Sequence, residues 1–144
     1  MIKYFITAFV ILLFGCESLN IAEVRNSSKE PIILTIHYDK ERMDSLFRTT
    51  SSGSSVKSIN SEASTSGFHY DFDTTNLVIK YTMPQGKSFR LYGGMGGIFH
   101  YRPDLYLFKE IDITNSTGTK YYLNKSFDTL FKKVSAGEYV IEVK

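Results

Sequence analysis

The chain has 144 residues, of which 17 are basic and 15 are acidic, and its formal net charge is +2. These charges form no basic stripe, so we expect no nucleic-acid partner. The single cysteine excludes an intramolecular disulfide. The 10 tyrosines and 11 phenylalanines, together with many Thr, Ile and Val residues, favour strands over helices.

The first fifteen residues have the three parts of a secretory signal. Lys3 supplies a positive charge, residues 4–14 form an apolar run, and the small residue Gly15 ends the segment. The run is shorter than the roughly 20 residues that a membrane-spanning helix needs. We therefore expect a signal peptide at residues 1–15.

The end of this segment reads Leu13-Phe14-Gly15-Cys16. It resembles the lipobox of bacterial lipoproteins, in which the cysteine is acylated and becomes the first residue of the mature protein. The resemblance implies that Cys16 is the lipid-attachment residue. It also implies that the protein lies in the bacterial cell envelope, held to a membrane at the periplasmic face or the cell surface. An ordinary secretory peptide with an incidental cysteine is the alternative.

Removal of the signal leaves one ordinary domain. We expect a lipidated tether at residues 16–22 and a folded domain at residues 23–144. A first strand ending near Asn26 and a second strand over Pro31–Tyr38 are predicted to pair as a hairpin through the turn residues 26–31.

The stretch from Asp39 to Arg48 suits one or two amphipathic helical turns or a short strand. Residues 49–66 contain eleven Ser or Thr residues and few apolar ones, which predicts a surface loop. An exposed edge strand around Val56–Ile59 is the main alternative there.

Short alternating segments follow, separated by turn residues. Strands are expected over residues 68–72, 77–82, 88–92, 105–114, 120–123 and 139–143. The glycine run at residues 93–97 is expected to end the strand before it, as a flexible loop or a bulge. In the strand at 105–114, Lys109 falls on the apolar face. Such spacing is typical of an all-β sandwich.

Residues 127–134 fit helical spacing, with Ser126 as a possible N-cap. However, the segment from Leu130, LFKKVSAGEYVIEV, resembles the closing hairpin of transthyretin-like and carboxypeptidase-regulatory-like β-sandwiches. This resemblance favours a strand. We predict an all-β fold, a small antiparallel β-sandwich of transthyretin-like or immunoglobulin-like type, and we transfer no function from the resemblance.

No catalytic motif is apparent. The glycine run lacks the dinucleotide-binding order, and no nucleophile motif occurs, so we expect neither an enzyme nor a cofactor. His37, His69 and His100 are each followed by Tyr, and two of them begin a His-x-Asp pattern. Three such strands would be able to converge on a metal. Solvent-facing polar positions are the preferred interpretation, and metal binding remains open.

The leading hypothesis is a lipid-anchored, non-catalytic envelope lipoprotein that acts as a protein-binding accessory or assembly component, for example of a secretion apparatus. One alternative is an immunity protein or inhibitor that neutralises a toxin or a lysozyme. Another is a carbohydrate- or metal-binding envelope protein. The sequence leaves open the partner, the membrane and the oligomeric state.

Overall fold

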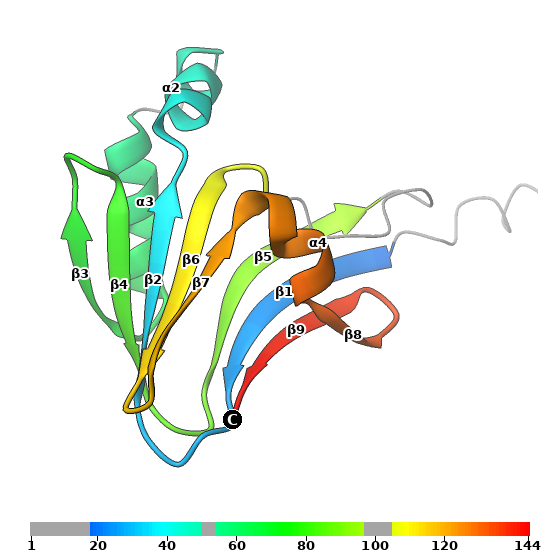
Figure 1. Cartoon of the computed structure of the whole chain (residues 1–144). Coiled ribbons are helices and arrows are strands. Elements are labelled where there is room, and N and C mark those ends of the chain that lie inside the picture. The colour runs from blue at the N-terminus through cyan, green and yellow to red at the C-terminus, as the bar shows by residue number, and fades with distance from the viewer. Residues whose placement is uncertain (1–17, 50–53, 97–104) are drawn as a thin grey trace, which may run out of the picture.

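The computed structural model describes residues 18–49, 54–96 and 105–144, which form two β-sheets packed face to face (Figure 1). The molecule is a small, mostly β, sandwich-like domain, which confirms the predicted fold class. No helix in these ranges is long and apolar enough to cross a membrane.

The first sheet, sheet A, has four strands in the order β5-β1-β9-β8. They are β1 (Ser18–Asn26), β5 (Ser88–Gly96), β8 (Lys132–Ser135) and β9 (Glu138–Val143). β1 pairs antiparallel with β5 but parallel with β9. The first and last strands of the fold are therefore neighbours, and sheet A is complete only when the C-terminus is in place.

The second sheet, sheet B, has five strands in the order β3-β4-β2-β6-β7, and every neighbouring pair is antiparallel. They are β2 (Ile32–Tyr38), β3 (His69–Asp73), β4 (Val78–Met83), β6 (Phe108–Asn115) and β7 (Gly118–Leu123).

Helices occupy two of the connections. α2 (Lys40–Thr49) and α3 (Ser55–Thr65) follow β2, while the short η1 (Asn124–Ser126) and α4 (Phe127–Leu130) precede β8. Residues 127–134, which fitted both helical and strand spacing, contain an element of each kind. They begin with one helical turn, α4, to which Ser126 gives no side-chain cap, and β8 then pairs with β9 in the predicted closing hairpin.

The core lies between the sheets because side chains alternate along each strand. On β2, Ile32 and Leu34 are almost fully buried, while Ile33, which lies between them, is exposed on the opposite face. Across the core, the rings of Tyr81 on β4 and Phe89 on β5 pack against each other in a tilted arrangement, with centroids 4.3 Å apart. This contact joins sheet B to sheet A.

The prediction of a loop over residues 49–66 is wrong for residues 55–65, and so is the alternative edge strand. These residues form α3, which Ser54 caps by accepting a hydrogen bond from Lys57 N at 3.3 Å. Ser55, Ile59 and Ala63 recur every four residues and are buried on one helix face. In the sequence, the helical spacing of only three residues is outweighed by the Ser/Thr-rich composition around them, which is why the sequence predicts a loop.

The predicted hairpin through residues 26–31 is also wrong, because β1 and β2 belong to different sheets. The segment crosses from sheet A to sheet B. Asn26 is fully buried at its start, and its Nδ2 donates to the carbonyl oxygens of Glu30 at 2.9 Å and Met83 at 3.1 Å. A turn signal in the sequence does not distinguish a hairpin from a crossover.

The prediction that the glycine run ends a strand is wrong for the described part of the run. β5 continues to Gly96, and residues 93–96 pair with residues 18–21 of β1. The predicted irregularity lies just before the run, where one extra residue of β5 opposes the step from Ala22 to Glu23. β1 begins at Ser18, so most of the segment expected as a tether is strand.

β6 begins at Phe108 rather than at Leu105. A register shift opposite His37 and Tyr38 places Phe108 in the core and leaves Lys109 exposed. The prediction that Lys109 lies on the apolar face of the strand is therefore wrong, because the bulge shifts the alternation of side chains by one residue at this point.

Candidate functional site

The outer face of sheet B, turned away from the core, gathers the most varied chemistry of the described chain. In chain order it carries Ile33, Thr35, His37, His69, Asp71, Asp73, Val78, Lys80, Thr82, Glu110, Asp112, Thr114, Thr119, Tyr121 and Leu123. One row crosses all five strands in register: Asp71, Lys80, Thr35, Asp112 and Tyr121. Residues from five separate strands therefore form one surface.

The centre of this face is a His–Asp pair. His37 Nε2 on β2 lies 2.9 Å from Asp112 Oδ2 on β6. Asp112 is only 9% exposed, and its other oxygen, Oδ1, has no hydrogen-bond partner among the described residues. A buried acceptor without a partner costs free energy, so it marks a place where a donor would be bound favourably.

A shallow hollow of about 710 Å³ lies over this pair. It is lined by Thr35, His37, Asp71, Asp73, Asn76, Val78, Lys80, Asp112, Thr114, Thr119 and Tyr121. Its lining includes neither serine nor cysteine, and two of its threonines, Thr114 and Thr119, bond each other with hydroxyl oxygens 2.8 Å apart. The hollow can hold and orient polar groups.

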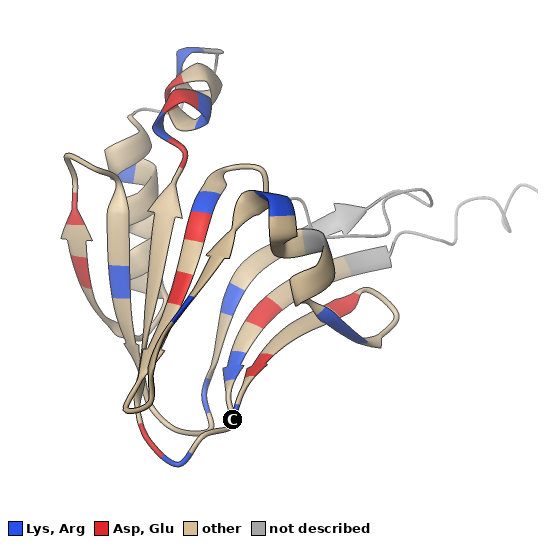
Figure 2. Cartoon of the chain, viewed as in Figure 1, with Lys and Arg blue, Asp and Glu red and all other residues tan. Residues whose placement is uncertain are grey.

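The electrostatics of the face are mainly acidic. Four carboxylates on β3 and β6 oppose Lys80 on β4, as the red and blue segments of Figure 2 show. Two hydrogen bonds from Asn76, the stronger from its side chain at 2.7 Å, hold the pKa of Asp73 below its ordinary value. That carboxylate is therefore charged at neutral pH, and the face attracts cationic groups.

Exposed apolar side chains lie on the same face. Tyr121 is 66% exposed, and Ile33 and Leu123 are each 43% exposed. Tyr121 stands directly across from Asp112, and Leu123 across from Glu110. The face thus combines apolar contact area with charged groups.

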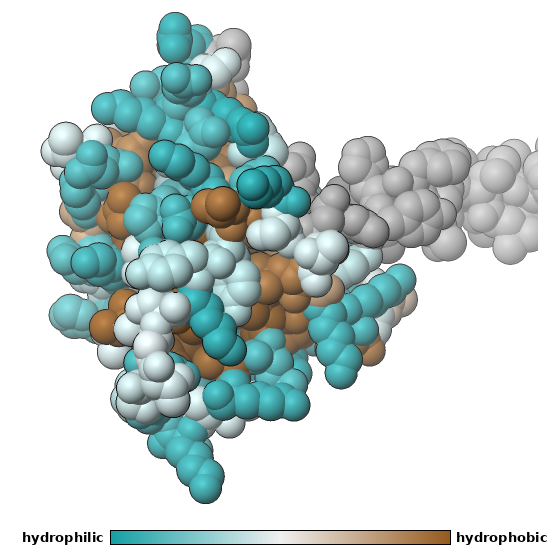
Figure 3. Space-filling model, viewed as in Figure 1, coloured by the Kyte–Doolittle hydropathy of each residue, from teal (hydrophilic) through white to brown (hydrophobic). Residues whose placement is uncertain are grey.

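Two further hollows have different linings. One, of about 430 Å³, lies where β7 meets β9 and includes Ile113, Tyr122 and Val143; Figure 3 shows apolar surface near the centre of this side. The other, of about 420 Å³, lies between α2, α3 and β5 and is mostly apolar. There, burial raises the pKa of Glu62 and that of Tyr38.

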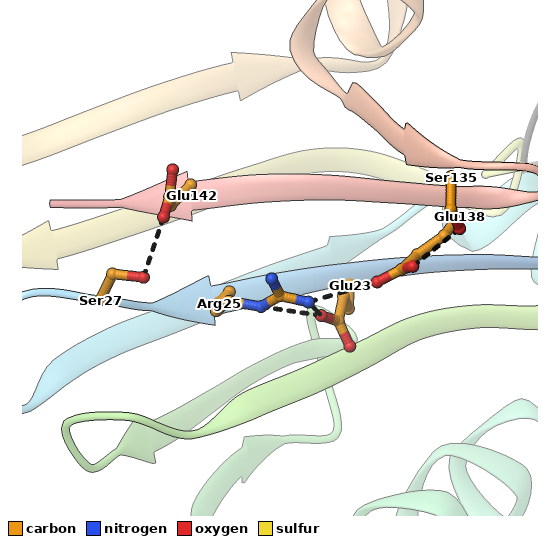
Figure 4. A network of polar contacts seen from close by, with 6 residues as sticks. All are labelled: Glu23, Arg25, Ser27, Ser135, Glu138 and Glu142. Carbon is orange, nitrogen blue, oxygen red and sulfur yellow. Dashed lines mark hydrogen bonds and ion pairs between the residues drawn. The ribbon is translucent and has the colours of Figure 1, made fainter.

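The outer face of sheet A carries a polar network instead (Figure 4). Arg25 on β1 donates to Glu23 on the same strand and, at 3.3 Å, to Glu138 on β9. The hydrogen bond from Arg25 to Glu23 raises the pKa of Arg25. At one end of the network, Ser135 Oγ on β8 donates a hydrogen bond to Glu138 Oε2 at 2.9 Å. This network connects the parallel strands β1 and β9, and we assign it a structural role.

The described histidines do not converge. His37 and His69 share the outer face of sheet B but lie two strands and four residues apart, which corresponds to about 16 Å. Asp39, which completes the His-x-Asp pattern of His37, accepts a hydrogen bond from Arg42 N at the start of α2. His100 lies outside the described residues, and the remaining residues contain no group of three metal-ligating side chains.

Sequence reasoning missed the partner of His37. Asp112 is 75 residues away, within the strand predicted over residues 105–114, and nothing in the local sequence relates it to His37. Cys16 and the signal segment lie outside the described residues. Comparison of the chain with protein-family models, with curated proteins and with solved structures finds no match.

Proposed function

We propose that this protein is a lipid-anchored, non-catalytic envelope lipoprotein that binds another protein through the outer face of sheet B. One observation carries the choice of face. Of the five exposed large apolar side chains in the described ranges, three lie there: Ile33, Tyr121 and Leu123. Aromatic and aliphatic residues surrounded by polar ones are typical of protein–protein interfaces.

The charges of the face define the partner that it fits. The acidic residues of β3 and β6 favour a basic surface, because complementary potentials speed association and select partners. Asp112 supports this choice, since a buried carboxylate with a free acceptor forms strong, charge-assisted hydrogen bonds with Arg or Lys donors. We therefore expect a partner that presents a basic side chain beside an apolar group.

Two observations support the other parts of the proposal. The lipobox-like sequence that ends at Cys16 supports the lipid anchor. The lining of the hollow over His37 and Asp112 lacks serine and cysteine, which supports binding rather than covalent catalysis.

Site-specific photocrosslinking in the native envelope tests the binding face. A photoreactive amino acid at Tyr121 should yield one discrete protein adduct, and the same residue at Arg90, exposed on β5 of sheet A, should not. Reversing the charge of the acidic strand with Asp71→Lys and Asp73→Lys should weaken the Tyr121 adduct at least about tenfold, as expected for an interface that depends on charge complementarity.

Two outcomes would contradict the binding face. Equal adducts from positions 121 and 90 would refute the binding face. The absence of a protein adduct both from Tyr121 and from a photoreactive amino acid placed at Leu123 would also refute it. A thermal shift with zinc or with envelope glycans in the absence of any protein adduct would favour the carbohydrate- or metal-binding alternative. An adduct that contains a toxin or a lysozyme would assign the immunity or inhibitor role.

The anchor is tested separately by metabolic labelling with a palmitate analogue. The unaltered chain should carry the label and sediment with membranes, whereas Cys16→Ser should lose the label and become soluble. Persistence of the label in Cys16→Ser would refute acylation at this residue.

A further inference from the structure

The first strand starts very close to the proposed lipid. β1 begins at Ser18, two residues after Cys16. Two extended residues span about 7 Å at most. A lipid on Cys16 would therefore hold the beginning of β1 within about 7 Å of the membrane surface, and would leave the domain little freedom to move away.

The β8–β9 hairpin points toward this same end of the molecule. β9 runs parallel to β1, so both strands begin at one end, and Ile21 N donates to Gly137 O at 2.7 Å. The turn between β8 and β9 is thus level with Ile21. Figure 1 shows the turn on the side where β1 begins. We call residues 132–137 the hairpin tip.

The hairpin tip is cationic and partly apolar. Lys132 and Lys133 are exposed, and neither has an acidic partner within the described ranges, whereas Val134 is 46% exposed. The nearby carboxylate of Glu138 is already engaged by Ser135 and Arg25, as Figure 4 shows. The two lysines are therefore free to bind anionic groups outside the protein.

We propose that the hairpin tip rests on an anionic phospholipid surface, with Lys132 and Lys133 against the headgroups and Val134 at the interface. The inference rests on the proposed anchoring through Cys16. Basic residues close to an anionic leaflet are attracted to it within about one Debye length. Lys132 and Lys133 are level with Glu23 and Ala22, about 13–17 Å along the strand from the beginning of β1, and they come within this range when β8, the edge strand of sheet A, lies along the surface. In this orientation the outer face of sheet B remains open to a partner.

Depth-dependent quenching tests the contact. The full acylated chain is reconstituted into vesicles of phosphatidylcholine and phosphatidylglycerol that contain a headgroup spin label. Because acylation consumes Cys16, Val134→Cys provides a unique thiol for an environment-sensitive fluorophore. Lys29→Cys, in the exposed crossover, is the matched control, because this crossover follows the end of β1, about 15 Å along the strand from the level of position 134.

We expect the label at position 134 to be quenched at least about threefold more than the label at position 29, since quenching by headgroup labels requires proximity to the surface. Combining Lys132→Glu and Lys133→Glu should remove most of this difference. The control pair Lys57→Glu and Lys87→Glu, which carries the same charge change on α3 and in the exposed β4–β5 turn, should preserve it.

The outcomes separate the hairpin contact from the anchor. Equal quenching at positions 134 and 29 in a chain whose mass shows acylation would overturn the hairpin contact and leave the anchor standing. Equal losses with both lysine pairs would also overturn it, because the attraction would then be nonspecific. A chain without lipid mass would overturn the anchor, and the hairpin contact with it. Circular dichroism of each variant confirms that the fold is kept.

Discussion

At the scale of single residues, Asn26 is a fully buried polar side chain that makes four hydrogen bonds. Its Nδ2 donates to two carbonyl oxygens, and its Oδ1 accepts from Ser28 N at 3.1 Å and from Ser28 Oγ at 2.6 Å. Its backbone also bonds Gly86 and Lys87 in the β4–β5 turn. The side chain and the backbone of Asn26 together therefore fix the crossover against a turn that lies 60 residues away in the sequence.

Asn26→Ala should be strongly destabilising. The substitution leaves the carbonyl of Met83 and the polar groups of Ser28 without their partner in a buried place, which we expect to lower the free energy of unfolding by about 3 kcal/mol. Urea unfolding measures the change. The control is Asn115→Ala, since Asn115 makes two similar bonds to Thr117 in an exposed turn and should cost less than about 1 kcal/mol. Equal losses would contradict the assigned role of Asn26.

The same crossover is held at a second point. Glu30 Oε1 accepts from Ser116 Oγ at 2.6 Å and from Ser116 N at 2.9 Å in the β6–β7 turn. These bonds, that from the side chain first, lower the pKa of Glu30 below its ordinary value. Glu30 is therefore charged at neutral pH, and its contribution to stability is lost only as the pH falls through this lowered pKa.

At the scale of elements, α3 shows how packing can determine a helix. Its sequence is rich in Ser and Thr, which compete with helical hydrogen bonds, and an isolated helix of eleven residues is marginal in water. Burial of Ile59 and Ala63 against the core stabilises it instead. Composition alone predicts a loop because the decisive contacts are made with residues from other parts of the chain.

Ile59→Ala should reveal this dependence. Ile59 is almost fully buried, so the substitution should lower the free energy of unfolding by about 3 kcal/mol and reduce helical signal more than a loop mutation would. Thermal and urea unfolding followed by circular dichroism measure both effects. Lys57→Ala, on the exposed side of the same helix, should change stability by less than about 0.5 kcal/mol. Similar small effects for both would show that α3 is not anchored by Ile59.

The strands were more predictable than their pairing. Phe68, Tyr70 and Phe72 alternate in sequence, and the structure packs all three against the core, because period-two alternation reflects local strand geometry. The partner of each strand is not a local property. The connection at residues 26–31 looked like a hairpin because its turn residues serve a crossover equally well.

At the scale of the whole molecule, the candidate site could not be predicted for the same reason: it depends on which strands are neighbours. Thr35, Asp112 and Tyr121 become neighbours only through the strand order β2-β6-β7. Each was visible in the sequence as a polar or aromatic position on a strand. Their convergence depends on sheet order, which alternation patterns do not specify.

The closure of sheet A is the most nonlocal feature of the fold. β9 lies between β1 and β8, so the hydrogen bonds along one side of β1 come from the last residues of the chain. β9 also brings four buried apolar side chains, those of Tyr139, Val140, Ile141 and Val143. Without β9, β1 would have an unpaired edge and the core would lose one wall.

A chain that ends after Leu130 should therefore not unfold cooperatively. It lacks β8 and β9, and the loss of four buried apolar side chains, worth about 1.5–3 kcal/mol each, is comparable with the whole stability of a small domain. Deletion of Lys144 alone is the control: it removes one exposed residue and a surface ion pair with Glu142, so the thermal midpoint should barely change. Thermal unfolding followed by near- and far-ultraviolet circular dichroism compares the two chains. A sharp transition in the chain that ends after Leu130 would show that sheet B and the helices fold without the closing strands, and that β9 completes a core that is already formed.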